Sequence, residues 1–351
     1  MSMVISRTPY RVSFFGGGTD YRPWYQEHGG AVLATTINKY CYLHCRTLPP
    51  FFDHKSRVVW SQIELVDDHA DIRHPVIRAA LATFGITDGV EIHHHGDLPA
   101  RSGVGSSSAF TVGMLHSLYA LRGQMASKRQ LAELAIHIER EVLHEQVGVQ
   151  DQIETATGGL NRIDIRTDGS FEVQPLLMSQ SRTEELEDHL MLCYSGVSRT
   201  ASTIAAEQVA TIGERQHVLR RMYELVDEGQ RVLSSAAPLS DFGALLDETW
   251  QLKRSLTAKI APGFVDEIYQ RARSGGALGG KLLGAGGGGF MLLFVPPDAR
   301  PSVAAKLADL IHVPFAFETG GTQLVYYEPP RADRGARAPD PLRMIGSAIE
   351  V

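Results

Sequence analysis

The chain has 351 residues, of which 43% are apolar and 21% are charged, as expected of an ordinary globular protein of about two domains. Its 34 basic and 40 acidic residues give a net charge of −6, which argues against a broad nucleic-acid-binding face. The opening stretch MSMVISRTPYRV lacks the apolar core of a secretory signal, and no apolar run reaches the roughly 18 residues of a membrane span. Three sparse cysteines (Cys41, Cys45 and Cys193) indicate buried thiols in a reducing compartment, so we expect a cytoplasmic protein without a membrane partner.

The first predicted element is a strand over residues 11–15 that runs into three glycines and Thr19-Asp20. Glycines let a backbone approach a ligand closely, and the carboxylate can accept hydrogen bonds from ligand hydroxyls. Further predicted strands cover residues 36–46, 57–61 and 90–95. In the last of these, His93 and His95 share a face, but no third metal ligand is apparent, so we interpret this segment as a surface strand.

A Gly/Ser loop, SGVGSSSA, joins the strand at 90–95 to a helix predicted from Ser106 to about residue 122. This order points backbone N–H groups and a helix N-terminus at one place, which favours an anion. The segment 105–109 also resembles a nucleophile elbow, but neither His217 nor His312 lies in a setting distinctive of its catalytic partner. A tight turn with serine N-caps is the structural alternative.

A second helix is predicted over about 128–145, with its apolar residues on one stripe. It carries Glu139, and Asp151 follows twelve residues later, after a glycine. Taken alone, Glu139 would be interpreted as a charge on a solvated helix face. Short strands around 160–165 and 171–175 come next.

The second half begins with a strand near 190–194 and continues with long helical patterns over 204–235, 241–256 and 263–273. The stretch SGGALGGKLLGAGGGGF then leads into a strand at 290–295. Its GxGxxG spacing does not indicate a dinucleotide site, because a strand rather than a helix follows it. Part of the stretch also imitates a P-loop, but Leu282 stands where Ser or Thr would bind magnesium.

A helix near 301–311 and strands around Phe315 and Val325 are expected to close this second domain. Strands and helices that do not alternate strictly predict an α+β fold. We place an N-terminal domain at 1–185, a C-terminal domain at 186–328 and an extended tail at 329–351, which is rich in Pro, Arg and Asp.

Four segments, in this order, carry a family resemblance: RTPYRVSFFGGGTDY, LPARSGVGSSSAF, IEREVLHEQVGVQDQIETATGG and KLLGAGGGGF. Together they resemble the GHMP kinase superfamily, which includes galactokinases, homoserine kinases and mevalonate kinases. The resemblance implies a two-domain α+β fold. It has an N-terminal mixed βαβ domain that binds ATP, a C-terminal ferredoxin-like domain, and an active site between them.

The resemblance also implies roles for particular residues, with ATP and Mg²⁺ as cofactors. Asp151 would orient the attacking hydroxyl, with Arg11 beside it, and Ser107 and Glu139 would hold the metal, because Mg²⁺ prefers few carboxylates plus phosphate and water. The ATP phosphates would lie against Ser102, Gly103, Val104, Gly105, Ser106, Ser107 and Ser108. The acceptor would lie against Gly17, Gly18, Thr19, Asp20, Gly286, Gly287 and Gly288.

The acceptor is expected to be a sugar phosphate. The GGGTD segment lacks the Glu-His pair of galactokinases and resembles the form found in bacterial D-glycero-D-manno-heptose 7-phosphate kinases, which phosphorylate the anomeric oxygen. A related form in fucokinases keeps fucokinase-like and other sugar kinases open, as well as a non-catalytic binding protein. Lys253, Arg254 and Lys259 are candidates for the distal phosphate, and Lys281 is a candidate counter-charge only. The oligomeric state is left open, with a homodimer as one option.

Overall fold

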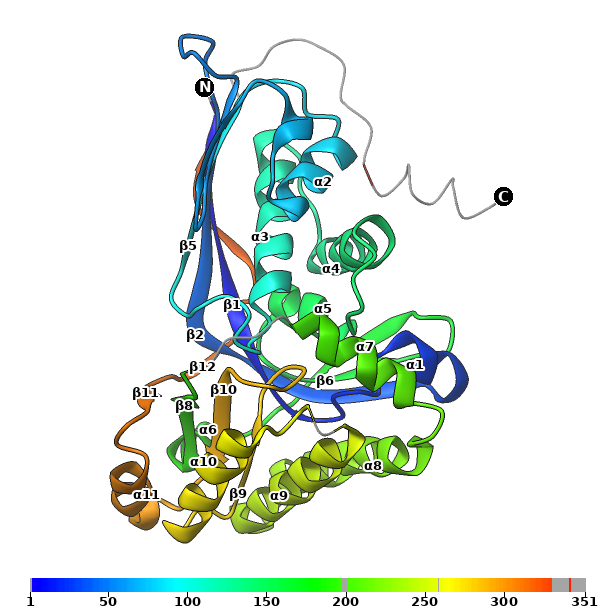
Figure 1. The fold of residues 1–351 in the computed structure, drawn as a ribbon, viewed down its shortest axis with the longest axis vertical. Helices are drawn as coiled ribbons and strands as arrows, with labels where there is room; N and C mark the ends of the chain where they lie inside the picture. Colours follow the sequence, from blue (N-terminus) through cyan, green and yellow to red (C-terminus); the bar gives the residue numbers. More distant parts are fainter. Residues whose placement is uncertain (1, 197–200, 258, 330–340, 342–351) are drawn as a thin grey trace.

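The computed structural model describes residues 2–196, 201–257, 259–329 and 341, and it contains two sheets with helices packed against them (Figure 1). The large sheet has the order β13-β1-β2-β5-β3-β4, and β2 also pairs with β6 and β12, while β7 pairs with β6. Its strands are β1 (Met3–Phe15), β2 (Gly30–Thr47), β3 (Ser56–Val59), β4 (Ile63–Val66), β5 (Val90–Gly96), β6 (Leu160–Ile165), β7 (Phe171–Pro175), β12 (Phe317–Glu318) and β13 (Gln323–Glu328).

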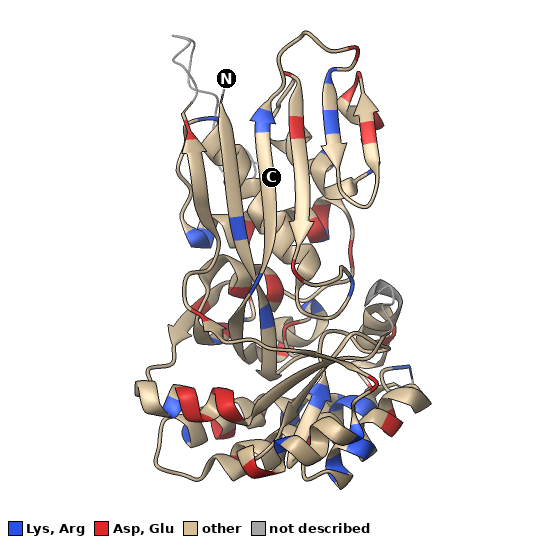
Figure 2. Ribbon diagram, turned by 90° about the vertical axis from the view of Figure 1, so that its left-hand side faces the viewer, with Lys and Arg blue, Asp and Glu red and all other residues tan. Residues whose placement is uncertain are grey.

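Helices cover one face of the large sheet. In Figure 1 they stand beside it, and in Figure 2, where the other face is turned toward the viewer, the strands lie in front of them. These helices are α2 (Pro75–Thr83), α3 (Ser106–Leu121), α4 (Lys128–His137) and α5 (Gln150–Thr157). α3 is buried over almost its whole length, because α2, α4, α5 and the sheet surround it. A π-helical turn (Ile138–Val142) continues α4 and carries Glu139.

Strand β1 changes character along its length, and this change leads to the site. From Met3 to Thr8 it alternates between half-buried and buried residues, as expected of a strand with one open face. From Pro9 to Phe15 every residue is buried, because the second domain covers the strand on its other side. β1 therefore delivers its last side chains into the junction between the domains.

The small sheet is antiparallel, with the order β11-β8-β10-β9. Its strands are β8 (Leu190–Tyr194), β9 (Gly279–Leu282), β10 (Phe290–Phe294) and β11 (Ile311–Val313). The helices of this half are α6 (Gln180–His189), α7 (Ala201–Thr211), α8 (Gln216–Leu233), α9 (Leu239–Leu256), α10 (Gly263–Ser274) and α11 (Arg300–Lys306). The remaining short helices within the described residues are α1 (Arg22–His28), η1 (His69–Asp71) and η3 (Pro297–Ala299).

The two halves share apolar core. The ring of Phe242 on α9 lies edge-on to those of Phe14 and Phe15 at the end of β1, with centroids 5.3 Å and 5.0 Å away, and it also meets Phe294 of β10. Aromatic pairs of this geometry add to the stabilisation from burial itself. The junction between the domains is therefore a packed interior.

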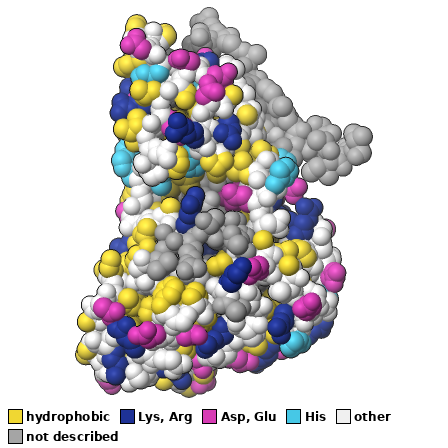
Figure 3. Space-filling model, in the orientation of Figure 1, with side chains coloured by type: hydrophobic (Ala, Val, Ile, Leu, Met, Phe, Trp, Pro, Cys, Tyr) yellow, Lys and Arg dark blue, Asp and Glu magenta, His cyan; other side chains and the backbone are white. Residues whose placement is uncertain are grey.

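The surface mixes both signs of charge. In Figure 3 acidic and basic side chains are interspersed over the face shown, in line with the small net charge. Among the described residues, no helix is both long and apolar enough to cross a bilayer.

The α+β architecture predicted from the sequence is confirmed, but one topological expectation is wrong. The strands expected to close the second domain, β12 and β13, instead return to the first, where they pair antiparallel with β2 and β1. The sequence cannot show this, because a strand's partner is decided by which sheet edge is free, far away along the chain. The helical pattern at 204–235 also splits into α7 and α8, and α1, α2 and α6 were not predicted. The predicted tail lies, apart from Pro329 and Pro341, outside the described residues.

Candidate active site

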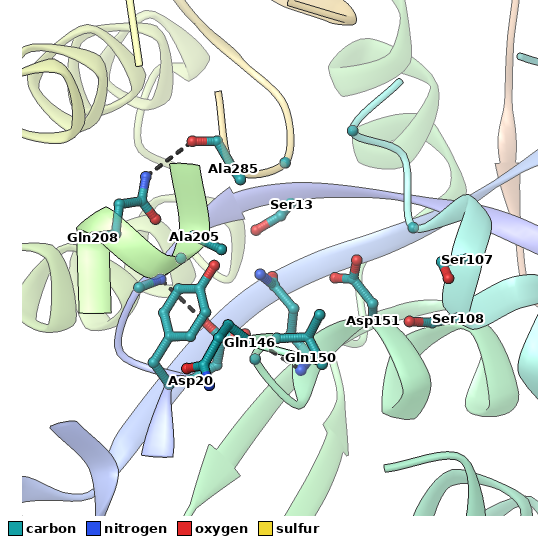
Figure 4. A pocket seen from close by; sticks show the side chains of 18 of the residues that line it. Ser13, Asp20, Ser107, Ser108, Gln146, Gln150, Asp151, Ala205, Gln208 and Ala285 are labelled. Carbon is teal, nitrogen blue, oxygen red and sulfur yellow. Dashed lines mark hydrogen bonds between the residues drawn. The ribbon is translucent and has the colours of Figure 1, made fainter. Parts of the chain in front are cut away.

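A cavity of about 620 Å³ lies where the two domains meet. Its wall is made by the end of β1, the Gly16–Tyr21 turn, the Gly/Ser loop, the start of α5, α7, the last turns of α9, β9 and the loop after it. Figure 4 looks into this cavity. All four sequence motifs reach it, although they are up to about 270 residues apart in the chain.

The Gly/Ser loop enters the cavity at the N-terminus of α3. Gly103 and Gly105 have φ angles of +86° and +72°, a left-handed conformation that favours glycine. No side chain caps the first turn of α3, so its N–H groups are available to an anion. Gly103, Gly105 and Ser106–Ser108 line the cavity.

Two expected members of this loop do not line the cavity. Ser102 is buried and donates its hydroxyl to the carbonyl of Pro99 over 2.6 Å, and Val104 is buried in the core. Side chains that alternate along a tight loop cannot all face the cavity. Ser102 and Val104 therefore face the interior, where they contribute to the shape of the loop.

Arg11 and Asp151 form a bidentate ion pair at the centre of the cavity. Nε and Nη2 of Arg11 donate to Oδ1 and Oδ2 of Asp151, each over 2.8 Å. The remaining arm, Nη1, donates to the carbonyl of Gly103 over 2.6 Å. Arg11 is 2% exposed and Asp151 25% exposed, so the carboxylate faces the cavity and the guanidinium lies behind it. In Figure 4 Asp151 lies between Ser13 and Ser107. One cation thus ties the carboxylate to the Gly/Ser loop.

Glu139 is completely buried beside the same loop. Its Oε2 accepts hydrogen bonds from Ser108 Oγ over 3.0 Å and from the Gln152 amide over 2.5 Å, while its Oε1 has no partner among the described residues. Burial raises the pKa of Glu139 to about 7. An orphaned carboxylate oxygen next to a hydroxyl fits a hard cation such as Mg²⁺. The serine bonded to Glu139 is Ser108, whereas Ser107, the serine expected at the metal, lines the cavity beside it.

The turn after β1 supplies a second acid. Asp20 is buried, and its two carboxylate oxygens accept the backbone N–H groups of Gly18 (2.9 Å) and Gln150 (3.4 Å). Burial raises its pKa, although these hydrogen bonds oppose the shift. A Cβ at position 148 would lie 1.8 Å from Asp20 Oδ2, so a larger residue there would displace this carboxylate. Asp20 therefore joins the turn to the start of α5 while it lines the cavity.

Thr19 has a structural place instead of the expected ligand contact. It is fully buried, and its hydroxyl bonds to the carbonyls of Gly16 and Ala31 rather than facing the cavity. Gly17 and Gly18, which we also expect at the acceptor, do line the cavity.

The last glycine stretch reaches the cavity through Gly284 and Ala285, whereas Gly286, Gly287 and Gly288, which we expect at the acceptor, do not line it. Gly286 packs against Ile260, and the N–H of Gly287 donates to the carbonyl of Ile260 over 2.9 Å. Those three glycines turn the chain back toward β10, outside the cavity wall.

Several cavity residues escaped the sequence analysis. Ser13 Oγ and Gln150 Oε1 line the wall without a hydrogen-bond partner in the structure, and Gln208 on α7 donates to the Ala285 carbonyl over 2.9 Å (Figure 4). Alternation along β1 could have indicated Ser13, since it lies two residues after Arg11 on the same face.

Of the three candidates for a distal phosphate, only Lys253 lines the cavity. Arg254 pairs with Asp266 at 2.7 Å, and Lys259 pairs with Glu207. Lys281 of β9, predicted only as a counter-charge, lines the cavity as well.

The histidines considered for other chemistries lie elsewhere. His93 bonds to Glu91 over 2.8 Å, and the described residues hold no group of three or more His, Cys, Asp or Glu side chains that could bind a metal. His217 and His312 do not line the cavity, so neither can partner Ser106–Ser108 as a hydrolase would require.

Two family models match the chain. The N-terminal domain of GHMP kinases matches residues 72–159, and the C-terminal domain of GHMP kinases matches residues 235–312. The first match holds the Gly/Ser loop, Glu139 and Asp151, and the second holds the last glycine stretch.

Named relatives extend this similarity over most of the chain. A D-glycero-alpha-D-manno-heptose 7-phosphate kinase of Campylobacter jejuni is 28% identical over 88% of this chain and 94% of its own length. A bifunctional fucokinase/GDP-fucose pyrophosphorylase of Arabidopsis thaliana is 28% identical over 81% of the chain, which spans 29% of that longer protein. Among solved structures, a D-glycero-D-manno-heptose 1-phosphate kinase from Bacteroides thetaiotaomicron superposes with a TM-score of 0.75 at 22% identity, over 94% of this chain and all of that one.

Proposed function

The chain belongs to the GHMP kinase superfamily, and we propose that it transfers the γ-phosphate of ATP to the anomeric hydroxyl of D-glycero-D-manno-heptose 7-phosphate. As a member of that superfamily it is a phosphotransferase with an alcohol group as acceptor, and ATP is its phosphoryl donor. The product would be the 1,7-bisphosphate, a precursor of nucleotide-activated heptose for capsule or lipopolysaccharide synthesis.

One observation carries the proposal: the Asp151 carboxylate faces the cavity next to the Gly/Ser loop, and Arg11 bonds to both. Phosphoryl transfer depends on in-line positioning and charge stabilisation more than on covalent chemistry. A hydroxyl that donates to Asp151 lies within reach of a γ-phosphate at the N-terminus of α3. The sugar oxygen then bonds to the γ-phosphorus as the bond to the ADP oxygen breaks, and the hydroxyl proton leaves toward Asp151.

The nucleotide is proposed to lie with its phosphates on the Gly/Ser loop. The left-handed glycines and the uncapped first turn of α3 present N–H groups there, and the hydroxyls of Ser106 and Ser107 face the same space. Mg²⁺ would be held by the orphaned oxygen of Glu139 and a serine hydroxyl, and it would neutralise charge on the phosphates. The serine is Ser108 by its bond to Glu139, or Ser107 by its place on the wall.

We propose that the acceptor lies against polar groups on the other side of Asp151. Ser13 Oγ and Gln150 Oε1 have no hydrogen-bond partner among the residues that the structure describes, and Asp20 lies on the same wall. Sugar hydroxyls would therefore satisfy groups that are otherwise costly to bury. Gly17 leaves space open beside Ser13 and Gln150, because a Cβ at this position would lie 3.9 Å or more from either side chain. The similarity to a heptose 7-phosphate kinase over nearly its full length supports heptose 7-phosphate among the sugars.

A panel of acceptors tests the assignment. Purified enzyme is given ATP and Mg²⁺ with heptose 7-phosphate, fucose, galactose or mevalonate, and ADP release is measured. The highest kcat/KM is expected with heptose 7-phosphate, and removal of Mg²⁺ by chelation should stop turnover. Equal or better rates with fucose or galactose would reject the heptose assignment, and no ADP release with any acceptor would favour a non-catalytic binding protein.

A further inference from the structure

Two lysines from different elements lie buried in the wall of the cavity. Lys253 is on the last turns of α9 and is 7% exposed, and Lys281 is on β9 and is 2% exposed. Lysine is almost never so completely buried unless it is paired. Both side chains nevertheless line the same cavity as Arg11 and Asp20.

Neither lysine has an acidic partner. The structure gives no ion pair within 4.0 Å between either ammonium and a carboxylate of the described residues. Their hydrogen bonds go to backbone carbonyls instead: Lys253 Nζ donates to Leu282 (2.8 Å) and Gly284 (2.5 Å), and Lys281 Nζ donates to Phe14 (3.0 Å). Two ammonium groups have six N–H donors. These three bonds therefore leave three donors for a ligand.

The nearest other charges do not neutralise the pair. Arg11 and Asp20 are the charged groups that act on Lys281, and Lys281, Arg11 and Asp20 are those that act on Lys253. Arg11 is already committed to Asp151, and Asp20 to two backbone N–H groups. Burial lowers the pKa of Lys281 to about 7 and that of Lys253 well below its ordinary value, with the neighbouring cations adding to the shift. In the absence of an opposite charge, the protein therefore disfavours the charged form of both lysines.

The backbone contacts of the two lysines indicate where an anion would bind. Gly284, whose carbonyl accepts from Lys253, packs directly against Gly103 of the Gly/Ser loop. Phe14, whose carbonyl accepts from Lys281, follows Ser13, whose hydroxyl lines the acceptor side of the cavity. The two ammonium groups thus lie between the position proposed for the ATP phosphates and the position proposed for the sugar.

We propose that Lys253 and Lys281 together form a phosphate subsite, in which a phosphoryl dianion accepts hydrogen bonds from both side chains. The inference rests on the proposed function, because a kinase acting on a sugar phosphate brings two such groups into this cavity. One is the phosphate already on the acceptor, and the other is the phosphoryl group in transfer. The chemistry that the lysines recognise is the same in both cases, and kinetics separates the two sources.

The kinetic test replaces each lysine with methionine, which keeps the length of the side chain and removes its charge. Lys281→Met and Lys253→Met are compared with the wild type and with Lys306→Met, which removes one charge from an exposed position on α11. Steady-state rates are measured with heptose 7-phosphate and with unphosphorylated heptose. If the subsite binds the acceptor's phosphate, KM for heptose 7-phosphate rises at least tenfold and the rates with heptose do not change.

If the subsite instead acts on the phosphoryl group in transfer, kcat falls at least tenfold with both acceptors while KM changes little. Either result supports the subsite. Unchanged kinetic parameters with both acceptors in folded Lys281→Met and Lys253→Met variants would overturn it.

A binding measurement on the wild-type enzyme does not depend on how the variants fold or on which sugar is the acceptor. Sulfate, a phosphate mimic that does not titrate near neutral pH, is added to the enzyme with ADP at pH 8 in two buffers of different ionisation enthalpy. Because an anion favours the charged forms of Lys253 and Lys281, whose pKa values burial lowers, sulfate binding should be accompanied by proton uptake. Sulfate that does not bind, or that binds without proton uptake, would contradict the subsite. A panel that prefers another acceptor would reject the heptose assignment and leave this sulfate result standing.

Discussion

The guanidinium of Arg11 donates two parallel hydrogen bonds of 2.8 Å to the carboxylate of Asp151, and its Nη1 donates a third to the carbonyl of Gly103. A planar fork fixes a carboxylate in both position and orientation, which a lysine could not do. The same side chain therefore sets where the carboxylate points and where the Gly/Ser loop lies. A substitution of Arg11 would therefore change both the charge next to Asp151 and the position of the Gly/Ser loop.

Asp151→Asn is expected to lower kcat by about 10²–10⁴ while ATP still binds, because the amide keeps the shape of the side chain but loses the charge that orients the hydroxyl. Rates are measured with saturating ATP and acceptor, and nucleotide affinity is measured by calorimetry. Turnover like that of the wild type would remove Asp151 from the mechanism, and a loss of ATP binding would indicate a different role.

Arg11→Met is expected to lower the free energy of unfolding by about 3–5 kcal/mol, since it leaves the Asp151 carboxylate without its buried partner. The matched control is Arg22→Met, which removes an ion pair to Glu141 in which both side chains are about half exposed. The control should change stability by less than about 1 kcal/mol. Urea unfolding of both variants gives the comparison, and similar losses in the two would contradict the buried pair as a source of stability.

Gly103→Ala is expected to destabilise the protein and to impair turnover. Its φ of +86° is strained for alanine, and the added Cβ would lie 2.5 Å from the carbonyl oxygen of Leu283. The control, Gly263→Ala, adds a Cβ with nothing within 4 Å at the start of α10. The control should leave the melting temperature and KM for ATP unchanged, whereas equal behaviour of the two variants would show that the loop tolerates a side chain.

His116 should make the protein less stable in acid. Burial lowers its pKa to about 4 from the ordinary 6.5. Above pH 6.5 the residue is neutral in both the folded and the unfolded chain and contributes nothing to the pH dependence. Between pH 6.5 and 4 the unfolded chain takes up a proton that the folded one refuses, so stability falls by up to about 3 kcal/mol.

The His116→Gln variant should flatten part of this decline, and the rest includes His74, whose pKa burial also lowers to about 4. Urea unfolding from pH 7 to pH 4 measures the slope, with His217→Gln on an exposed position as the control. An unchanged slope in His116→Gln would contradict the assignment.

The sequence predicted most of the local structure, because its signals are local. Glycines in SGVGSSSA indicated the turn before α3, and the apolar spacing of α9 and α10 indicated helices within two residues of their observed bounds. The return of β13 to β1 was missed, since pairing between residues more than 300 positions apart leaves no pattern in either strand.

The site was predicted where a motif carries it and missed where the fold brings single residues together. Asp151, Arg11 and Glu139 lie on the cavity wall, as the motifs indicated. Lys281 was predicted only as a counter-charge, yet two signals mark a buried position. For Lys281 the signal is its position among glycines and leucines in GGKLLG. For Lys253 the signal is a helical position on the same face as buried Leu246 and Trp250. A charged residue on an apolar stripe is a cue that spacing alone can provide.

The back-to-back contact of Gly103 and Gly284 has a consequence for any attempt to divide this protein. Phe290, in the second domain, also donates its N–H to the carbonyl of Ser102. Backbone of the C-terminal half therefore holds the Gly/Ser loop in place. A fragment that ended before β8 would retain every serine of the Gly/Ser loop but lose the contacts from Gly284 and Phe290 that hold the loop in its conformation. The surface that we propose for the nucleotide is therefore formed by both halves of the chain. A chimera that exchanges halves with a relative would need matching glycines at positions 103 and 284.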